Sequence, residues 1–328
     1  MKKVLGIGNA LTDILIKLEN DNFLSGFELP KGSMQLINVD LSTRILLDAE
    51  GMKRTLVSGG SVANTIHGLT ALGIKTGFVG KIGFDSWGVF FEKDMKEQGI
   101  NPILFKGKNE SGRCIALISP DSERTMATYL GAAIELTADD ISPEIYDGYD
   151  FLHIEGYLVQ NKRLLETALK VAKDKGLTVS LDLASYNVVA ENRDFLLDMT
   201  KKYVDILFAN EEEAKSFSKE QDNDKALDFM SNMCNLSILK KGSDGSIISY
   251  NGIKTHISTE PVKSIDTTGA GDLYAAGFIY GLINSLPIDK CGQIASLTAA
   301  NVIQVIGTKL SDKTWNSIKQ KIDVIINN

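Results

Sequence analysis

Residues 266–283 read DTTGAGDLYAAGFIYGLI, and the other motifs of the chain are interpreted in relation to this stretch. Gly269 and Gly271 flank Ala270 at the point where an apolar run of helical character begins. The first N–H groups of a helix have no intrahelical acceptor and carry partial positive charge, so such a helix start predicts an anion site. Because glycine has no side chain, an anion can approach this backbone closely.

Asp272 falls in the first turn of the expected helix, beside the anion. A carboxylate there would repel a phosphate, unless its task is to take a proton from a hydroxyl that attacks the phosphate. N–H donors next to a base are the parts of a phosphoryl-transfer centre. The alternative is an ordinary turn followed by an acidic residue that complements the helix dipole. The remaining motifs have to decide between the two.

The composition is that of an ordinary globular protein. The chain has 328 residues, of which 43% are hydrophobic and 23% charged, and its net charge is −7. An acidic chain without a Lys/Arg cluster argues against a nucleic-acid partner. Three widely spaced cysteines argue against a disulfide framework or a zinc site, and no apolar stretch is long enough to span a bilayer. We therefore expect a cytoplasmic protein with neither nucleic acid nor membrane as a partner.

The second half of the chain alternates between strand and helix patterns. From residue 150 onward, the buried runs YDFLHIEG, LTVSLDLA and VDILFAN are separated by amphipathic helical segments. This order predicts an α/β fold whose parallel sheet is covered by helices on both faces. Functional side chains should then follow the carboxyl ends of the strands.

Two polar residues, Asn9 and Asp13, follow the first expected strand, KKVLGIG. Gly6 and Gly8 suggest a dinucleotide-binding turn, but Leu11 stands where the third glycine of that fingerprint is required. Asp13 can accept hydrogen bonds from two adjacent hydroxyls at once, as a ribose or hexose diol requires. The alternative is that Asp13 only caps a turn.

A second glycine pair, Gly59 and Gly60, precedes another helix of apolar spacing. Asn64 lies one turn into that helix, and its amide can both donate to and accept from sugar hydroxyls. Further along, Asn210 and Glu213 follow the strand VDILFAN. They can be an N-cap with first-turn acids, a site for the water shell of Mg²⁺, or both at once.

Together these runs resemble the ribokinase-like (PfkB) family of sugar and nucleoside kinases. The matching motifs are DTxGAGD at 266–272, GG-x-x-x-N at 59–64, N-x-x-E at 210–213 and a K-x-G loop at 240–242. The resemblance implies an ATP-dependent phosphotransferase with a doubly wound three-layer α/β/α core, residues 1–328 forming a single domain. It also implies a small β-sheet lid built from about residues 14–40 and 102–131.

The resemblance assigns residues to each part of the reaction. The expected catalytic residues are the base Asp272, the anion-hole residues Gly269, Ala270 and Gly271, and Arg124 over the transferred phosphate. The expected acceptor-binding residues are Asn9, Asp13, Gln35, Gly59, Gly60 and Asn64. The expected ATP and Mg²⁺ residues are Asn210, Glu213 (acting on the metal through water), Lys240, Gly242, Gly245, Thr268 and Asn301.

Several stretches resemble adenosine kinases most, among them GNALTDI at 8–14 and VDILFANEEEA at 204–214. The expected substrate is therefore the 5′-hydroxyl of adenosine. The alternative is a sugar kinase of the fructokinase, ribokinase or 2-keto-3-deoxygluconate kinase type, since LDLASY at 181–186 offers no phenylalanine to stack on adenine. The family also implies a monovalent cation such as K⁺, and either a monomer or a homodimer formed through the lids.

Overall fold

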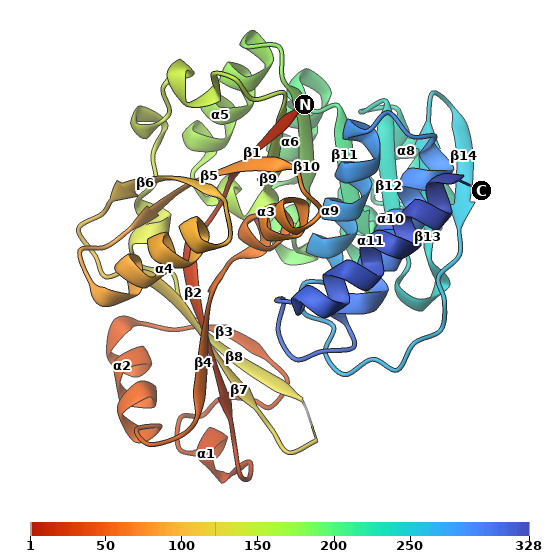
Figure 1. Cartoon of the computed structure of the whole chain (residues 1–328). Coiled ribbons are helices and arrows are strands. Elements are labelled where there is room, and N and C mark those ends of the chain that lie inside the picture. Colours follow the sequence, from red (N-terminus) through yellow and green to blue (C-terminus); the bar gives the residue numbers. More distant parts are fainter. Residues whose placement is uncertain (1, 122, 328) are drawn as a thin grey trace.

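The computed structural model describes residues 2–121 and 123–327, and a large sheet runs through its centre (Figure 1). Within these residues the sheet has nine strands in the order β14-β13-β12-β11-β10-β9-β1-β5-β6. Their bounds are β1 Lys3–Ile7, β5 Lys75–Ile82, β6 Asn101–Lys106, β9 Phe151–Glu155, β10 Thr178–Asp182, β11 Ile206–Asn210, β12 Leu236–Lys240, β13 Ser246–Tyr250 and β14 Ile253–Ile257. The pairs from β6 to β12 are parallel, whereas β13 and β14 are added antiparallel.

Both faces of this sheet are buried, which explains the continuous apolar runs of its strands. In β11, Leu207 and Ala209 belong to the core on one face, and Ile206 and Phe208 belong to the core on the other. Successive residues of a strand point to opposite faces, so a strand covered on both sides has no polar face to present. The expected fold, a mostly parallel α/β sheet between two helical layers, is confirmed.

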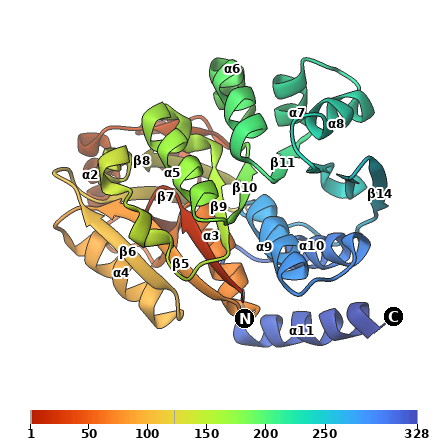
Figure 2. The same ribbon diagram turned by 90° about the horizontal axis from the view of Figure 1, so that it is seen from above.

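The helices form the two outer layers, as the view from above shows (Figure 2). One layer contains α5 Lys162–Asp174, α6 Tyr186–Tyr203, α7 Glu211–Ser218 and α8 Asn223–Ser231. The other contains α3 Ser61–Ala71, α4 Ser86–Glu97, α9 Ala270–Ile283 and α10 Ile288–Val302, with α11 Asp312–Asn327 packed outside α10. Among the helices of the described residues, none is both long and apolar enough to cross a membrane.

A smaller sheet lies beside the core, at the bottom of Figure 1. Its strand order is β3-β8-β7-β2-β4, with bounds β2 Leu11–Lys17, β3 Met34–Leu36, β4 Arg54–Gly59, β7 Gly112–Ile118 and β8 Arg124–Tyr129. Ile14 and Ile16 of β2 pack into its own apolar core with α1 Asn22–Ser25 and α2 Val39–Asp48. Asp13 and Leu15 alternate with them and therefore point to the opposite face.

The boundaries of this smaller sheet differ from those expected for the lid. Residues 102–106, expected in the lid, belong to β6 at the edge of the large sheet, because β5, α4 and β6 form a parallel strand–helix–strand unit. Conversely β4, which precedes the Gly59-Gly60 pair, pairs antiparallel with β2 and joins the small sheet. Short patterns of this kind do not reveal which of two sheets a strand will join.

Candidate active site

The loop before α9 is shaped by its glycines and by Asp266. Gly269 is the N-cap of α9 and has φ 76°, a backbone conformation that favours glycine. Asp266 accepts hydrogen bonds from the N–H of Thr268 at 3.0 Å and from the N–H of Gly307 at 2.8 Å. The Asp266 side chain therefore holds in place the loop before α9, where the first helical N–H groups have no intrahelical acceptor.

Asp272, in the first turn of α9, is held by two donors from α3. The Ser61 hydroxyl donates to Asp272 Oδ1 at 2.8 Å, and Asn64 Nδ2 donates to Asp272 Oδ2 at 2.9 Å. Burial raises the pKa of Asp272 to about 6, although these two hydrogen bonds oppose the shift. A carboxylate with a pKa near 6 is ionised at neutral pH yet still basic enough to accept a proton.

The glycine pair makes room for the residues expected to hold the acceptor. A Cβ at Gly59 would collide with the carboxylate of Asp13, and one at Gly60 would collide with the backbone oxygen of Asn9. Gly60 also has φ 101°, which disfavours other residues. Burial raises the pKa of Asp13 to about 7. The pair thus brings Asn9 and Asp13 against the start of α3, beside Asn64.

Glu155, at the end of β9, is a site residue that was not expected. Its Oε1 accepts from the backbone N–H and from Nδ2 of Asn9 at 3.0 and 3.1 Å, and its Oε2 accepts from the N–H of Val62 at 3.2 Å. Burial raises its pKa to about 7. Glu155 therefore orients Asn9. The signal that could have found it is its place at the carboxyl end of a buried parallel strand.

Lys240 brings a positive charge to the start of α9. Its Nζ donates to Asp182 Oδ2 at 2.7 Å, and a Cβ at Gly271 would lie 3.2 Å from it. Burial lowers the pKa of Lys240, but the carboxylates of Asp182 and Glu213 outweigh this and raise it. Asp182 was also not expected, although it ends strand β10 just as Glu155 ends β9. The missing side chain of Gly271 leaves space for the ammonium group.

Asn210 and Glu213 form a reciprocal capping box at the start of α7. The Asn210 side chain accepts from the Glu213 N–H at 2.9 Å, and Glu213 accepts from the Asn210 N–H at 2.8 Å and from its Nδ2 at 2.7 Å. Burial raises the pKa of Glu213, and Lys240 partly offsets this. Glu213 nevertheless lines a cavity that Asp272 also lines, so capping and a role at that cavity are compatible.

Arg124 reaches the anion loop from the small sheet. Its Nη2 lies 3.0 Å from Asp266 Oδ2, and both side chains are almost fully buried. Neither Nε nor Nη2 makes a well-directed hydrogen bond with any described residue, so the contact with Asp266 is one of charge rather than of hydrogen-bond geometry. Both nitrogens are buried, and Arg124 does not line the cavity that contains Asp272.

Three cavities adjoin in a row around Asp272. The central one, of about 340 Å³, is lined among others by Asp13, Asn64, Thr268 and Asp272. Lys240 and Gly271 separate it from a second cavity of about 530 Å³, which Gly242, Gly245 and Ala270 also line. Tyr157 separates it from a third cavity of about 720 Å³ that Asn9 also lines.

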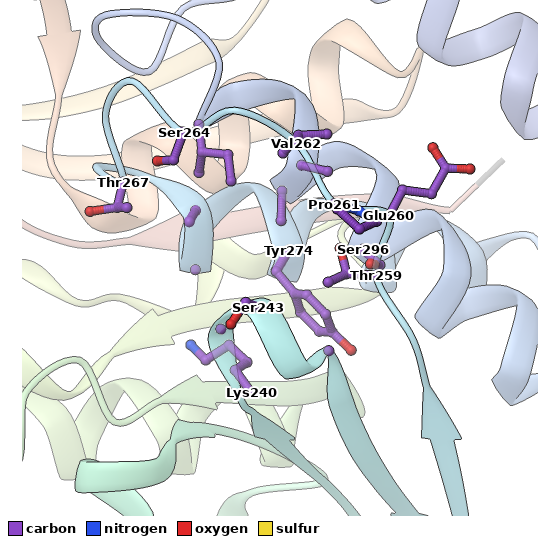
Figure 3. Close-up of a pocket in the computed structure, with 17 residues that line it drawn as sticks. Lys240, Ser243, Thr259, Glu260, Pro261, Val262, Ser264, Thr267, Tyr274 and Ser296 are labelled. Atoms are coloured by element: carbon purple, nitrogen blue, oxygen red, sulfur yellow. The ribbon is translucent and has the colours of Figure 1, made fainter.

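The second cavity is mainly apolar away from Lys240. In Figure 3, Lys240 and Ser243 approach it from the end of β12, while Thr267 and Ser264 lie on the opposite side. The Tyr274 ring forms part of its wall, and the Tyr274 hydroxyl is hydrogen-bonded to Ser246 at 2.7 Å. An apolar pocket that ends at a helix start and a lysine suits a flat ring carrying phosphates.

Three expected site residues neither line one of these cavities nor shape a turn beside one. Asn301 does not line the second cavity, because its amide donates to the Leu297 carbonyl within α10, and Ala299, Ala300 and Ile303 form the wall instead. Gln35 is exposed on β3, the edge strand of the small sheet, and lines none of the three cavities. Arg124 also lines none of the three cavities and contacts Asp266 instead, whereas the other expected residues line the cavities or shape the turns beside them.

Comparison with known proteins gives concordant matches. Residues 34–315 match the model described as pfkB family carbohydrate kinase. A 5-dehydro-2-deoxygluconokinase of Geobacillus kaustophilus is 29% identical over 84% of this chain and 87% of its own length. The solved probable sugar kinase protein of Rhizobium etli is 30% identical, with a TM-score of 0.87 over 98% of both chains. Adenosine kinase of Sinorhizobium meliloti is 31% identical, with a TM-score of 0.87 over 98% of this chain and 99% of that one.

Proposed function

This chain belongs to the pfkB carbohydrate kinase family, and we propose that it transfers the γ-phosphoryl group of ATP to a primary hydroxyl, the 5′-hydroxyl of adenosine. That it is a kinase follows from the family; the donor, the acceptor and the residue roles are the proposal. The observation that carries it is the position of Asp272, a buried carboxylate at a helix start between two larger cavities.

Asp272 serves as the general base in this proposal. The acceptor hydroxyl lies in the central cavity and passes its proton to an Asp272 oxygen as its own oxygen attacks the γ-phosphorus. One P–O bond forms, the bond from the γ-phosphorus to the bridging oxygen breaks, and ADP leaves with that electron pair. Ser61 and Asn64 hold the carboxylate in place, so its reorientation does not add to the barrier.

Two positively charged features meet the developing negative charge. They are the N–H groups at the start of α9 and the Lys240 ammonium, both on the donor side. Arg124 of the small sheet lies beside the anion loop through its contact with Asp266. Preorganised donors of this kind are worth ~10²–10³ each in rate. Asp13 and Asn9 bind the hydroxyls of the acceptor sugar.

The donor set fits a Mg²⁺ ion that is held chiefly by phosphate and water. Among the described residues no three His, Cys, Asp or Glu side chains are grouped as a metal site. Mg²⁺ commonly binds through substrate phosphates and keeps several waters. Glu213 and Asp182, which line the central cavity, would face those waters. The ion would neutralise phosphate charge. The K⁺ dependence implied by the family stays a prediction.

Adenosine is favoured over a simple sugar by the third cavity. About 720 Å³ adjoins the central cavity beyond Tyr157, and its walls combine apolar residues such as Ile134 and Leu136 with the amides of Asn161 and Asn192. A purine offers a flat face for apolar contacts and an edge for amide groups. The adenosine kinase of Sinorhizobium meliloti, 31% identical along nearly the whole chain, supports the same acceptor.

A sugar-acid acceptor is the second candidate. The Geobacillus kaustophilus relative, 29% identical over 84% of this chain, is named for 5-dehydro-2-deoxygluconate. The polar side chains of the third cavity, Gln160, Asn161, Lys162 and Asn192, can bind carboxylate and hydroxyl groups. Such an acceptor uses the same base and the same anion loop.

ADP release with Mg-ATP tests both candidates in one experiment. Adenosine, inosine, ribose, fructose, 2-keto-3-deoxygluconate and 5-dehydro-2-deoxygluconate are compared as acceptors at equal concentration, with Asp272→Asn as the inactive control. We expect adenosine to have the highest kcat/KM. A sugar acid that turns over faster would replace adenosine and leave the mechanism intact. ADP release that does not depend on any acceptor would count against both.

A further inference from the structure

Thr308 connects the loop after α10 to the carboxylate that serves as base. It is buried, and its hydroxyl donates to Asn64 Oδ1 at 2.9 Å across 244 residues of sequence. Asn64 in turn donates from Nδ2 to Asp272 Oδ2 at 2.9 Å. Thr308, Asn64 and Asp272 thus form a chain of two hydrogen bonds that ends on the base.

The two ends of the Asn64 amide are not equivalent toward a carboxylate. Nδ2 facing Asp272 donates and stabilises the ionised form, whereas Oδ1 facing Asp272 would repel it. The two orientations have the same shape, so only hydrogen-bond partners choose between them. Thr308 is the partner at the far end of the amide.

Thr308 favours one orientation because its hydroxyl has a proton to donate. Among the described residues its only side-chain hydrogen bond is the one to Asn64 Oδ1. If the amide were reversed, Nδ2 would face Thr308 and the buried hydroxyl proton would lose its acceptor, which is costly. The arrangement with Thr308 donating therefore places Nδ2 on Asp272.

The methyl group of Thr308 has a separate contact that a test must keep apart from the hydroxyl. A Cβ built on Gly269 would lie 2.6 Å from Thr308 Cγ2, so the methyl group packs on the Gly269 backbone at the start of α9. The neighbouring Gly307 N–H is bonded to Asp266. Valine preserves this shape and removes the hydroxyl, and serine does the reverse.

We propose that Thr308 is a positioning residue whose hydroxyl holds the Asn64 amide in the one orientation that donates to Asp272. The proposal rests on the proposed function, since it takes Asp272 as the base. The other titratable or charged groups that act on or around Asp272 are Asp13 on β2, Glu155 on β9, Tyr157, Asp182 on β10 and Lys240 on β12, together with Arg124 and Lys309, which act on Asp13. They are unchanged in Thr308 variants, so a change in the proton affinity of Asp272 reports on the amide.

The test compares the pH dependence of kcat/KM for adenosine and Mg-ATP in wild type, Thr308→Val and Thr308→Ser. In Thr308→Val we expect the acidic limb to move upward by about half to one pH unit, with kcat/KM at pH 6 about 2- to 5-fold lower. In Thr308→Ser the limb stays in place. The limb position does not depend on how much of a variant is folded, so reduced stability does not obscure the result.

Two results would overturn the proposal. One is a Thr308→Val profile that overlays wild type; the other is an equal shift in Thr308→Ser, which would assign the effect to packing of the methyl group. Failure of the proposed function looks different, because Asp272→Asn would then keep the wild-type rate. In that case the ¹³C carboxyl shift of Asp272, titrated by NMR in wild type and Thr308→Val, measures the same effect without turnover.

Discussion

The two large cavities on either side of Asp272 are built in different ways. The one beyond Lys240 takes all of its walls from residues 240–303, a continuous stretch that contains the anion loop and both helices behind it. The one beyond Tyr157 takes its walls from Asn9, from residues 133–136 and 157–164, and from Glu191 and Asn192. The first is a local unit of the chain, and the second is assembled from distant segments.

In the proposed function, the cavity beyond Lys240 holds the phosphoryl donor, and the cavity beyond Tyr157 selects the acceptor. The cavity beyond Lys240 combines glycine backbone at a helix start with side-chain walls from Tyr274, Ala299, Ala300 and Ile303, all within one stretch of the chain. The cavity beyond Tyr157 presents side chains from several elements, each of which can change independently. Relatives of similar identity are accordingly named for different acceptors, adenosine and 5-dehydro-2-deoxygluconate.

The largest expected effect does not depend on which of the two cavities a substrate occupies. Asp272→Asn removes the proposed base and should lower kcat by about 10²–10⁴-fold with every acceptor. ATP binding, measured by calorimetry, should change little, because the anion loop keeps its backbone donors. A variant that retains near-normal turnover would show that Asp272 is not the base and that the two cavities do not meet at a common catalytic residue.

A change at Lys240 should affect ATP more than the acceptor, although Lys240 also borders the central cavity. Lys240→Met leaves Asp182 as a buried, unpaired carboxylate, so we expect kcat/KM for ATP to fall about 10²-fold and the unfolding free energy by about 3 kcal/mol. The KM for the acceptor should stay within a factor of two. Adding Asp182→Asn should recover stability but not activity, as chemical denaturation and kinetics will show. Equal losses of kcat/KM for ATP and for the acceptor would contradict the idea that the two cavities act separately.

The rate at low pH should report on Asp272, which lies between the two large cavities. Burial raises the pKa of Asp272 to about 6, so the carboxylate is protonated as pH falls through that value and can no longer accept a proton. Below pH 6 we expect kcat/KM to decline by about tenfold per pH unit. The acidic limb should have the same position with adenosine and with any slower acceptor. A limb near pH 7 instead of pH 6 would assign it to Asp13 or Glu155, whose pKa values burial raises to about 7.

The smallest expected effect lies on the acceptor side. Tyr157→Leu removes the aromatic ring between the central and third cavities, and should raise the KM for adenosine about 5- to 10-fold. Tyr157→Phe keeps the ring and loses only the 3.2 Å hydrogen bond to the Ala184 carbonyl, so it is the matched control. The KM for ATP should be unchanged in both. A changed KM for ATP would show that Tyr157 also influences the cavity beyond Lys240.

The site could be predicted in part because much of it is encoded within short stretches. Gly269, Gly271 and Asp272 share one turn, and Asn210 and Glu213 cap the helix that they begin. The signals for Glu155 and Asp182 were also present, as acidic residues that end buried strands, but a single acidic residue is too common to be distinctive. The boundaries of the small sheet were predicted less well, since strand periodicity does not specify the partner strand.

The sequence by itself determined the local geometry of this protein: which glycines open a helix, which residue follows at the first turn, and that strands buried on both faces alternate with helices. These features depend on neighbouring residues and on backbone sterics. Only the tertiary structure decided that Asn64 donates to a carboxylate 208 residues away, that Arg124 meets Asp266, and that Lys240 meets Asp182. Such contacts depend on how the two sheets and their helices pack in space, and the spacing of residues along the chain does not specify which distant residues will meet.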